Sequence, residues 1–268
     1  MDWSIRMEKE EILKKIDNAE MILVGLGEDF DENIRLQKSD VYKEGMKMLK
    51  EADCFHLIPA WKDYCALELQ DLVTPALEKL KKMIEGKNYY VVATATNSKI
   101  SKISWKQERI VMPCGNSSMK QCRNNCDKQI YAVSEEEQEV IRSCFRSMKR
   151  GETPSDLRTL LGKCSKCNAE MELNNIYAHQ YNEEGYLPKW ETYTKWLQGT
   201  LNHNLVVLEL GVGLQFPSVI RWPFEKIVYF NKKAVMIRVH DTLYQLTEEL
   251  SGKGYGISQN PIEWLTNL

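Results

Sequence analysis

The chain has 268 residues, of which 43% are hydrophobic, so it is long enough to bury a full core without covalent cross-links. Its 36 basic and 38 acidic residues nearly balance, which argues against a nucleic-acid-binding protein, because such proteins need a basic surplus to offset phosphates. No leader of charged then apolar residues precedes Asp2 and no apolar run reaches membrane-spanning length, so we expect a cytoplasmic protein that does not bind membranes.

The first half of the chain alternates predicted helices and strands. In chain order these are a helix at 7–19, a buried strand at 21–24, a mostly helical stretch over 39–84 with a break near Pro59, and a core strand at 88–96. The first strand ends in Gly25-Leu26-Gly27, and a buried strand followed by two glycines at this spacing is how a dinucleotide-binding fold begins. The third glycine of that fingerprint is missing.

The second half continues the same alternation. Its predicted elements are a short strand at 109–112, a helix at 135–149, a helix at 188–201, a core strand at 205–210 and a last clear strand at 234–239. The strand at 205–210 is closed by Gly211-Val212-Gly213. Strands that are separated by helices and end in glycine turns predict an α/β fold, a Rossmann-like doubly wound sheet that is mainly parallel.

Four cysteines form two close pairs, Cys122-x3-Cys126 and Cys164-x2-Cys167. Four thiolates can surround one zinc ion, and the short loops let both sulfurs of each pair reach it. The alternatives are disulfides or unrelated core thiols, but in a reducing compartment such pairs are more often metal or redox sites. We therefore predict structural zinc in a small zinc-ribbon module at 113–175, inserted in a body formed by 1–112 and 176–268 that also carries a helical insertion.

The order of these landmarks resembles that of the sirtuins, the zinc-containing family that consumes NAD while modifying proteins. The landmarks are Gly25-x-Gly27, Thr96-Asn97, Cys114-Gly115, the two cysteine pairs, and Gly211-x-Gly213 in place of the family's GTS turn. Within the family the chain is most similar to the microbial branch associated with macrodomain operons, which is linked to protein ADP-ribosylation. The turn at 209–213, Pro217, Pro223-Phe224 and Ile237-Arg238 carry that likeness.

The resemblance implies that NAD and zinc are the cofactors, that a protein is the acceptor or partner, and that the oligomeric state is open. The residues it assigns to the cofactor are Gly25, Gly27, Asn97, Gly211, Gly213 and Arg238. It places the reacting ribose near Asn97 and Cys114, the two candidate catalytic residues, and makes Cys122, Cys126, Cys164 and Cys167 the zinc ligands. For Arg238 the alternative is a surface arginine that pairs with Asp241.

Two positions depart from the family pattern. Cys114 stands where active sirtuins carry the histidine that serves as general base, and a thiol with a reference pKa of about 8.5 cannot relay a proton as imidazole does near pH 7. Lys99 stands where the family has an aspartate that holds nicotinamide; it is either an anchor for an acidic group or an exposed loop lysine. Deacylation by the usual mechanism is therefore not expected.

The turn after Gly27 is acidic over residues 28–32. Asp29 with Glu32 three residues later spells a capping box, whose side chains would occupy amides that a phosphate uses. A carboxylate about 5 Å from a phosphate charge costs roughly 3 kcal/mol at an effective dielectric near 20, so we expect weakened NAD binding. Arg35 is the candidate substitute for an arginine that the family has nearby.

The remaining signals are weaker. Tyr186, Trp190, Tyr193 and Trp196 lie at helical spacing and fit either a substrate groove or core packing. The four histidines share no metal-ligand spacing.

Two functions stay open. One is an NAD-dependent transferase that moves ADP-ribose to a protein; the other is a catalytically degenerate zinc module that binds a nucleotide or a partner protein. The missing histidine, Lys99 and the acidic turn favour the second.

Overall fold

The computed structural model describes residues 9–268. The first predicted helix is α1 (Lys9–Asp17), and its predicted start at residues 7 and 8 lies outside the described residues. Among the described residues, no helix combines the length and the apolar character needed to cross a bilayer.

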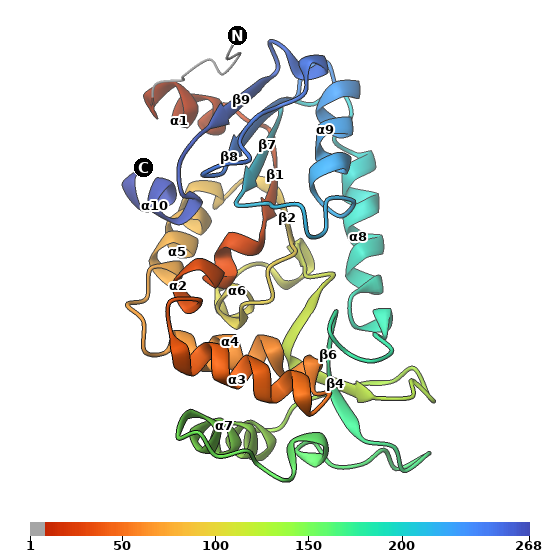
Figure 1. The fold of residues 1–268 in the computed structure, drawn as a ribbon. Helices are drawn as coiled ribbons and strands as arrows, with labels where there is room; N and C mark the ends of the chain where they lie inside the picture. Colours follow the sequence, from red (N-terminus) through yellow and green to blue (C-terminus); the bar gives the residue numbers. More distant parts are fainter. Residues whose placement is uncertain (1–8) are drawn as a thin grey trace.

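A six-stranded sheet forms the centre of the larger part of the molecule (Figure 1). Its strands are β1 (Met21–Leu26), β2 (Asn88–Ala93), β3 (Ile110–Val111), β7 (Leu205–Leu210), β8 (Val235–Val239) and β9 (Gly254–Ile257). The spatial order is β3-β2-β1-β7-β8-β9, and every neighbouring pair is parallel. The order reverses between β1 and β7, and a doubly wound sheet binds ligands at the carboxyl ends of its strands at such a point. The predicted fold class is confirmed.

Helices cover both faces of this sheet because successive strand residues point to opposite sides. Ile22 and Val24 belong to a core with α1, α5 (Val73–Ile84) and α10 (Pro261–Asn267). Leu23 lies in a core on the other face, under α8 (Leu187–Gln198) and α9 (Arg221–Phe230). Figure 1 shows the two helical layers on either side of the strands.

A second, smaller sheet lies beyond the carboxyl ends of β1 and β2 (Figure 1). It is antiparallel, in the order β5 (Ile130–Ala132), β4 (Gly115–Cys122) and β6 (Met171–Asn175). The predicted helix at 135–149 is α7 (Glu135–Lys149), which begins with a capping box between Ser134 and Glu137. That box satisfies two amides at the start of the helix.

One core joins this small sheet to helices from the first third of the chain. The helices are α2 (Asn33–Leu36), α3 (Asp40–Glu51) and α4 (Ile58–Ala66), so the predicted helical stretch over 39–84 divides into α3, α4 and α5. Trp61 of α4, Phe145 of α7 and Leu173 of β6 are all buried in this second core. The boundaries at 112 and 176 remain a prediction, but residues before 112 complete the core of the small unit.

The last strand and the last helix of the chain were not predicted from the sequence. The predicted elements end at a last strand over 234–239, whereas β9 follows β8 in the sheet and α10 covers its end. β9 has only four residues, two of them glycine, and so carries little of the apolar or branched signal by which strands are recognised.

Candidate active site and metal centre

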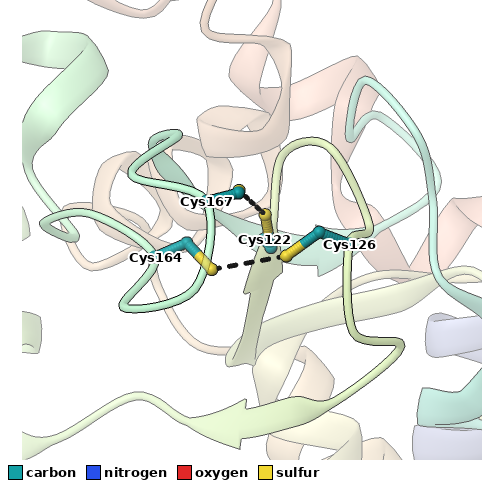
Figure 2. A group of neighbouring side chains, drawn as sticks. All are labelled: Cys122, Cys126, Cys164 and Cys167. Atoms are coloured by element: carbon teal, nitrogen blue, oxygen red, sulfur yellow. Dashed lines mark hydrogen bonds between the residues drawn. The ribbon is translucent and has the colours of Figure 1, made fainter.

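The four paired cysteines converge on one point of the small unit (Figure 2). Their sulfurs all lie within 4.8 Å of one another; Cys122 Sγ is 3.4 Å from Cys167 Sγ, and Cys126 Sγ is 3.6 Å from Cys164 Sγ. A tetrahedral zinc site with Zn–S bonds of about 2.3 Å sets its sulfurs roughly 3.8 Å apart. The donor set and spacing therefore fit a structural zinc ion, and the two pairs come from the end of β4 and from the loop before β6.

Ion pairs fasten this centre to the rest of the second core. Arg123 follows the first ligand and binds Glu172 of β6 at 2.9 Å and Asp53, after α3, at 2.7 Å. Glu172 is 2% exposed, so this charge needs the partner that Arg123 supplies. The metal loops are thus fixed to both the small sheet and the helical segment.

The glycine turns at the carboxyl ends of β1 and β7 pack directly against each other. A Cβ on Gly27 would lie 2.1 Å from the Gly211 carbonyl oxygen, and Gly211 itself has a φ of +61°. Gly25 lies earlier, inside β1, where a Cβ would meet Ile220 and Phe224 at 2.7 and 2.8 Å. Gly25 therefore allows α9 to approach the sheet, while Gly27 and Gly211 allow two backbone turns to touch.

Replacement of Gly27 by alanine is expected to destabilise the protein by about 3 kcal/mol, since the new methyl group overpacks against backbone that cannot move aside. Gly213→Ala is the matched control, because its Cβ would meet only the mobile end of Glu28, at 3.3 Å, and it should cost less than about 1 kcal/mol. Urea unfolding measures both. Equal and small losses of unfolding free energy in the two variants would contradict the close packing of the two turns.

The backbone amides of these turns bind groups of the protein itself. The Gly27 amide donates to the Leu210 carbonyl at 2.9 Å, and the Asp29 amide donates to the Gly211 carbonyl at 3.2 Å. The Gly213 amide donates to Glu28 Oε2 at 2.8 Å. A carboxylate of the chain thus stands where a phosphate would be expected at such a turn.

The predicted capping box between Asp29 and Glu32 is wrong. A 3-10 turn spans Glu28–Asp31 with no side-chain cap, and Glu32 adopts a left-handed conformation with a φ of 55°. The Glu32 carboxylate instead binds Arg35 and Lys99. Arg35 also donates to the Gln70 carbonyl, so the candidate phosphate-binding arginine is engaged within the protein.

Asp31 is the hub of a buried polar cluster that holds the predicted catalytic residue Asn97. It accepts hydrogen bonds from the Thr96 and Asn97 amides at 2.7 and 3.0 Å, and from Lys62 at 3.1 Å. Asn97 caps α6 (Ser98–Lys102) by accepting from the Lys99 amide, and its side chain donates to the Phe30 carbonyl. Asn97 therefore lies beside the turn that follows β1; its role in catalysis stays a prediction.

Asp63 of α4 connects this cluster to the small sheet. Its carboxylate accepts from the Ser98 amide and from the Ser117 hydroxyl of β4. Burial raises the pKa of Asp63 to about 6, although both hydrogen bonds favour the charged form.

Cys114 is not suited to a general-base role. The residue is 2% exposed, and burial, together with the charges of Glu28 and Asp31, raises the pKa of its thiol to about 12. The thiol is therefore protonated at neutral pH and cannot accept a proton as a general base. This burial does not support a general-base role for Cys114, and its assignment as a catalytic residue stays a prediction.

Lys99 is neither a free anchor nor an exposed loop lysine. It pairs with Asp71 at 2.9 Å and with Glu32 at 3.4 Å. Both partners lie on other loops, so Lys99 ties the start of α6 to the loops that flank α2 and α5.

Arg238 does not reach a ligand site through its side chain. The residue is 1% exposed and binds both oxygens of Glu209, at 2.6 and 3.0 Å, as well as the Gln245 carbonyl and Glu225. Glu209 and Arg238 are register partners on β7 and β8. The predicted ribose contact and its surface-pairing alternative with Asp241 are both replaced by a buried ion pair inside the sheet.

The aromatic row on α8 packs into the core. Tyr193 is 3% exposed, and its ring lies 5.1 Å from Trp190 and 5.2 Å from Tyr90 of β2, measured between centroids. Trp196 also contacts Tyr90. Core packing is thus the correct alternative for the three aromatic residues on α8, whereas Tyr186 precedes α8 and lines a separate cavity of about 300 Å³.

A cavity of about 540 Å³ opens beside the turn after β1. Its walls come from residues 28–35, from the loops after β8 and β9, and from α10; five of the residues are acidic and one is a guanidinium, namely Glu28, Asp29, Glu32, Asp241, Glu263 and Arg35. Burial, Glu28 and Asp241 raise the pKa of Asp29 to about 6. The cavity is therefore strongly negative. Among the described residues, its lining includes none of the six that were assigned to the cofactor.

Sequence reasoning missed Glu28, Asp31, Asp63 and Glu209 as individual residues of this region. Glu209 carried a usable signal, since it is an acid inside an otherwise apolar strand and Arg238 is its counterpart in the next strand. Glu28 and Asp31 were visible only as members of an acidic run.

Comparison with known families and with solved structures identifies the fold of the chain. The chain matches no profile of a known protein family. It is similar over 97% of its length, at a TM-score of 0.57 and 11% identity, to 94% of a Sir2 homologue solved with ADP-ribose. It is similar at a TM-score of 0.52 and 13% identity to Sir2Tm bound to a propionylated peptide, with 97% of each chain covered. The chain has the sirtuin fold.

Two curated proteins are similar in sequence to this sirtuin-like chain. One is a protein ADP-ribosyltransferase of Staphylococcus aureus, 20% identical over 95% of this chain and 85% of the relative. The other is a probable bifunctional ADP-ribose hydrolase/ADP-ribosyltransferase of Fusarium oxysporum f. sp. cubense, 27% identical over 50% of this chain and 23% of that protein. Both names concern ADP-ribose chemistry.

Proposed function

We propose that this sirtuin-like chain is an enzyme that transfers ADP-ribose from NAD to a side chain of an acceptor protein. The observation that carries the proposal is the similarity to the Staphylococcus aureus protein ADP-ribosyltransferase along nearly the whole chain, together with the sirtuin fold. NAD supplies an activated glycosidic bond to nicotinamide. The chain's part is to bind and orient the donor at the carboxyl ends of β1 and β7 and to exclude water from it.

The state of Cys114 supports transfer over deacylation. A protein deacylase of this fold needs a base at that position, and the buried Cys114 thiol stays protonated at neutral pH. ADP-ribosyl transfer can instead draw on the acceptor's own nucleophile, so Cys114 need not act chemically.

The Asn97 side chain is the remaining candidate for a direct role. We expect nicotinamide release from NAD by the intact, zinc-loaded protein, and a loss of about 100-fold in Asn97→Ser, the order expected when a reacting group loses its positioning. Serine retains an oxygen that can cap α6, so the thermal midpoint should change little. Chromatography of released nicotinamide gives the rate, and mass spectrometry of an added acceptor protein detects the transferred ADP-ribose. Unchanged release in Asn97→Ser would remove Asn97 from the site.

A specific observation favours the second candidate function, a module that binds a nucleotide or partner without catalysis. The amides of the glycine turns are occupied by the protein itself, and the adjoining cavity is acidic. This function predicts no nicotinamide release, with ADP-ribose still raising the thermal midpoint by mass action. The absence of both nicotinamide release and a thermal shift would contradict the transferase and the nucleotide-binding module, and would leave only a module that binds a partner protein.

A further inference from the structure

The Glu28 carboxylate lies at the centre of the region in which the proposed donor would bind. It follows Gly27, lines the 540 Å³ cavity, and accepts the Gly213 amide from the facing turn at 2.8 Å. Its other oxygen, Oε1, is buried and has no hydrogen-bond partner among the described residues. A carboxylate with one bonded and one unpartnered buried oxygen is poorly solvated, so its hold on the turn is weaker than that of a fully paired group.

Neighbouring acids make the position of Glu28 still less favourable. Burial is the main cause that raises the pKa of Asp29 and of the Cys114 thiol, and the charge of Glu28 adds to the shift of both groups. Arg221, which is close enough to feel the Glu28 charge, donates its hydrogen bonds to the Val212 and Leu243 carbonyls. The Glu28 carboxylate is thus bonded by one backbone amide and, among the described residues, by no cation.

The other acid that acts on Cys114 is held differently. Asp31 accepts two backbone amides, the Thr96 hydroxyl and the Lys62 ammonium group, so all its acceptor capacity is used within the fold. Releasing Asp31 would break four interactions, whereas releasing Glu28 breaks one. Glu28 is therefore the acid that can leave its position without local unfolding.

We propose that Glu28 determines ligand specificity in this site by competing with a ligand phosphate for the Gly213 amide. The proposal rests on the proposed function, because it takes a dinucleotide or ADP-ribose as the ligand. In the ligand-free chain the carboxylate holds the position of the diphosphate, and a diphosphate binds there only when Glu28 turns away. The site therefore gains little affinity from a ligand's phosphates, and recognises the nucleoside part more strongly than is usual for this fold.

The test is a thermodynamic cycle that compares ligands with and without the diphosphate in proteins that differ at residue 28. It uses the full zinc-loaded chain. Calorimetry gives the dissociation constants of adenosine and of ADP-ribose for the wild type, Glu28→Gln and Glu28→Ala. The quantity compared is the dissociation constant of adenosine divided by that of ADP-ribose. This ratio isolates the contribution of the part of the ligand that contains the diphosphate. We expect the ratio to rise about tenfold to a hundredfold in both variants, because a like charge about 5 Å away is removed.

Glu263→Gln is the matched control. Glu263 lines the same cavity from α10, but the Gly213 amide donates to Glu28 and not to Glu263, so the ratio in Glu263→Gln should change by less than about threefold. A rise in Glu263→Gln equal to that in Glu28→Gln would mean that the overall charge of the cavity is responsible, and would overturn the proposal. An unchanged ratio in Glu28→Gln would also overturn it, with the proposed function intact.

An amide spectrum separates the proposal from the function on which it rests. In nitrogen-15-labelled protein without ligand, the Gly213 amide resonance should move in Glu28→Ala and stay in place in Glu263→Gln. If neither ligand binds any variant at millimolar concentration, the proposed function fails and the competition fails with it. If the ligands bind but the Gly213 amide resonance does not move when Glu28 is replaced, only the proposed competition is contradicted.

Discussion

Cys122→Ala is expected to abolish zinc binding and to unfold the second core, the largest effect of any single substitution considered. Structural zinc contributes on the order of 10 kcal/mol to folding, which is comparable to the whole stability of a typical domain. Cys122 ends β4 and is 1% exposed, so the metal fixes the strand to the loop that carries Cys164 and Cys167. Atomic absorption and circular dichroism would measure the metal content and the loss of structure.

Cys144→Ala is the matched control for that experiment. Cys144 is also a buried thiol of the same core, but it belongs to α7 and lies outside the four-sulfur group. Its loss should cost about 1 kcal/mol, the ordinary effect of a point substitution, with one zinc retained. A soluble, folded and metal-free Cys122→Ala protein would contradict the zinc assignment.

Arg238→Met is expected to destabilise the protein by about 3–5 kcal/mol, because it leaves the Glu209 carboxylate buried without its main partner. Glu209 is fully buried, and its other arginine, Arg221, lies 3.6 Å away and points its hydrogen bonds to backbone carbonyls. Denaturant unfolding followed by tryptophan fluorescence measures the change. The double variant Arg238→Met, Glu209→Gln should recover much of the loss, since the fully buried charge is then gone and the remaining partner of Arg238, Glu225, is partly exposed to water.

An exposed pair provides the comparison for the buried one. Arg142 binds Glu139 on the surface of α7, where both side chains are about half exposed, and Arg142→Met should change stability by less than about 1 kcal/mol. A loss in Arg238→Met no larger than this would mean that Arg238 acts as a surface group. Failure of the double variant to recover stability would point to packing instead of charge.

The sequence predicted the sheet and the clustering of the four cysteines because both depend on local patterns. The apolar runs at 21–24 and 205–210 became β1 and β7, and the helix at 135–149 has the predicted bounds. Each cysteine pair is set by a short loop, so a single tertiary contact between the two loops forms the four-sulfur group.

The details of the turns could not be predicted, because they depend on contacts between distant segments. Glu28 meets Gly213, 185 residues later, and Asp31 meets Asn97, 66 residues later. Residue types alone favoured a capping box at Asp29, since Asp followed by Glu three residues later is common at helix starts. The tertiary contacts of Glu32 with Arg35 and Lys99 place it outside any helix cap.

The shared second core has a consequence for how the chain is made. Trp61, on α4, packs against Phe145, and both helices share their core with Cys164 and Leu173. A ribosome releases residues 40–66 about a hundred residues before the last cysteines, and the intervening segment includes four strands, β2 to β5. The early helices must therefore stay incompletely buried until the metal loops emerge. If the four sulfurs bind zinc as we predict, nascent chains would need the metal only after Cys164 and Cys167 have been translated.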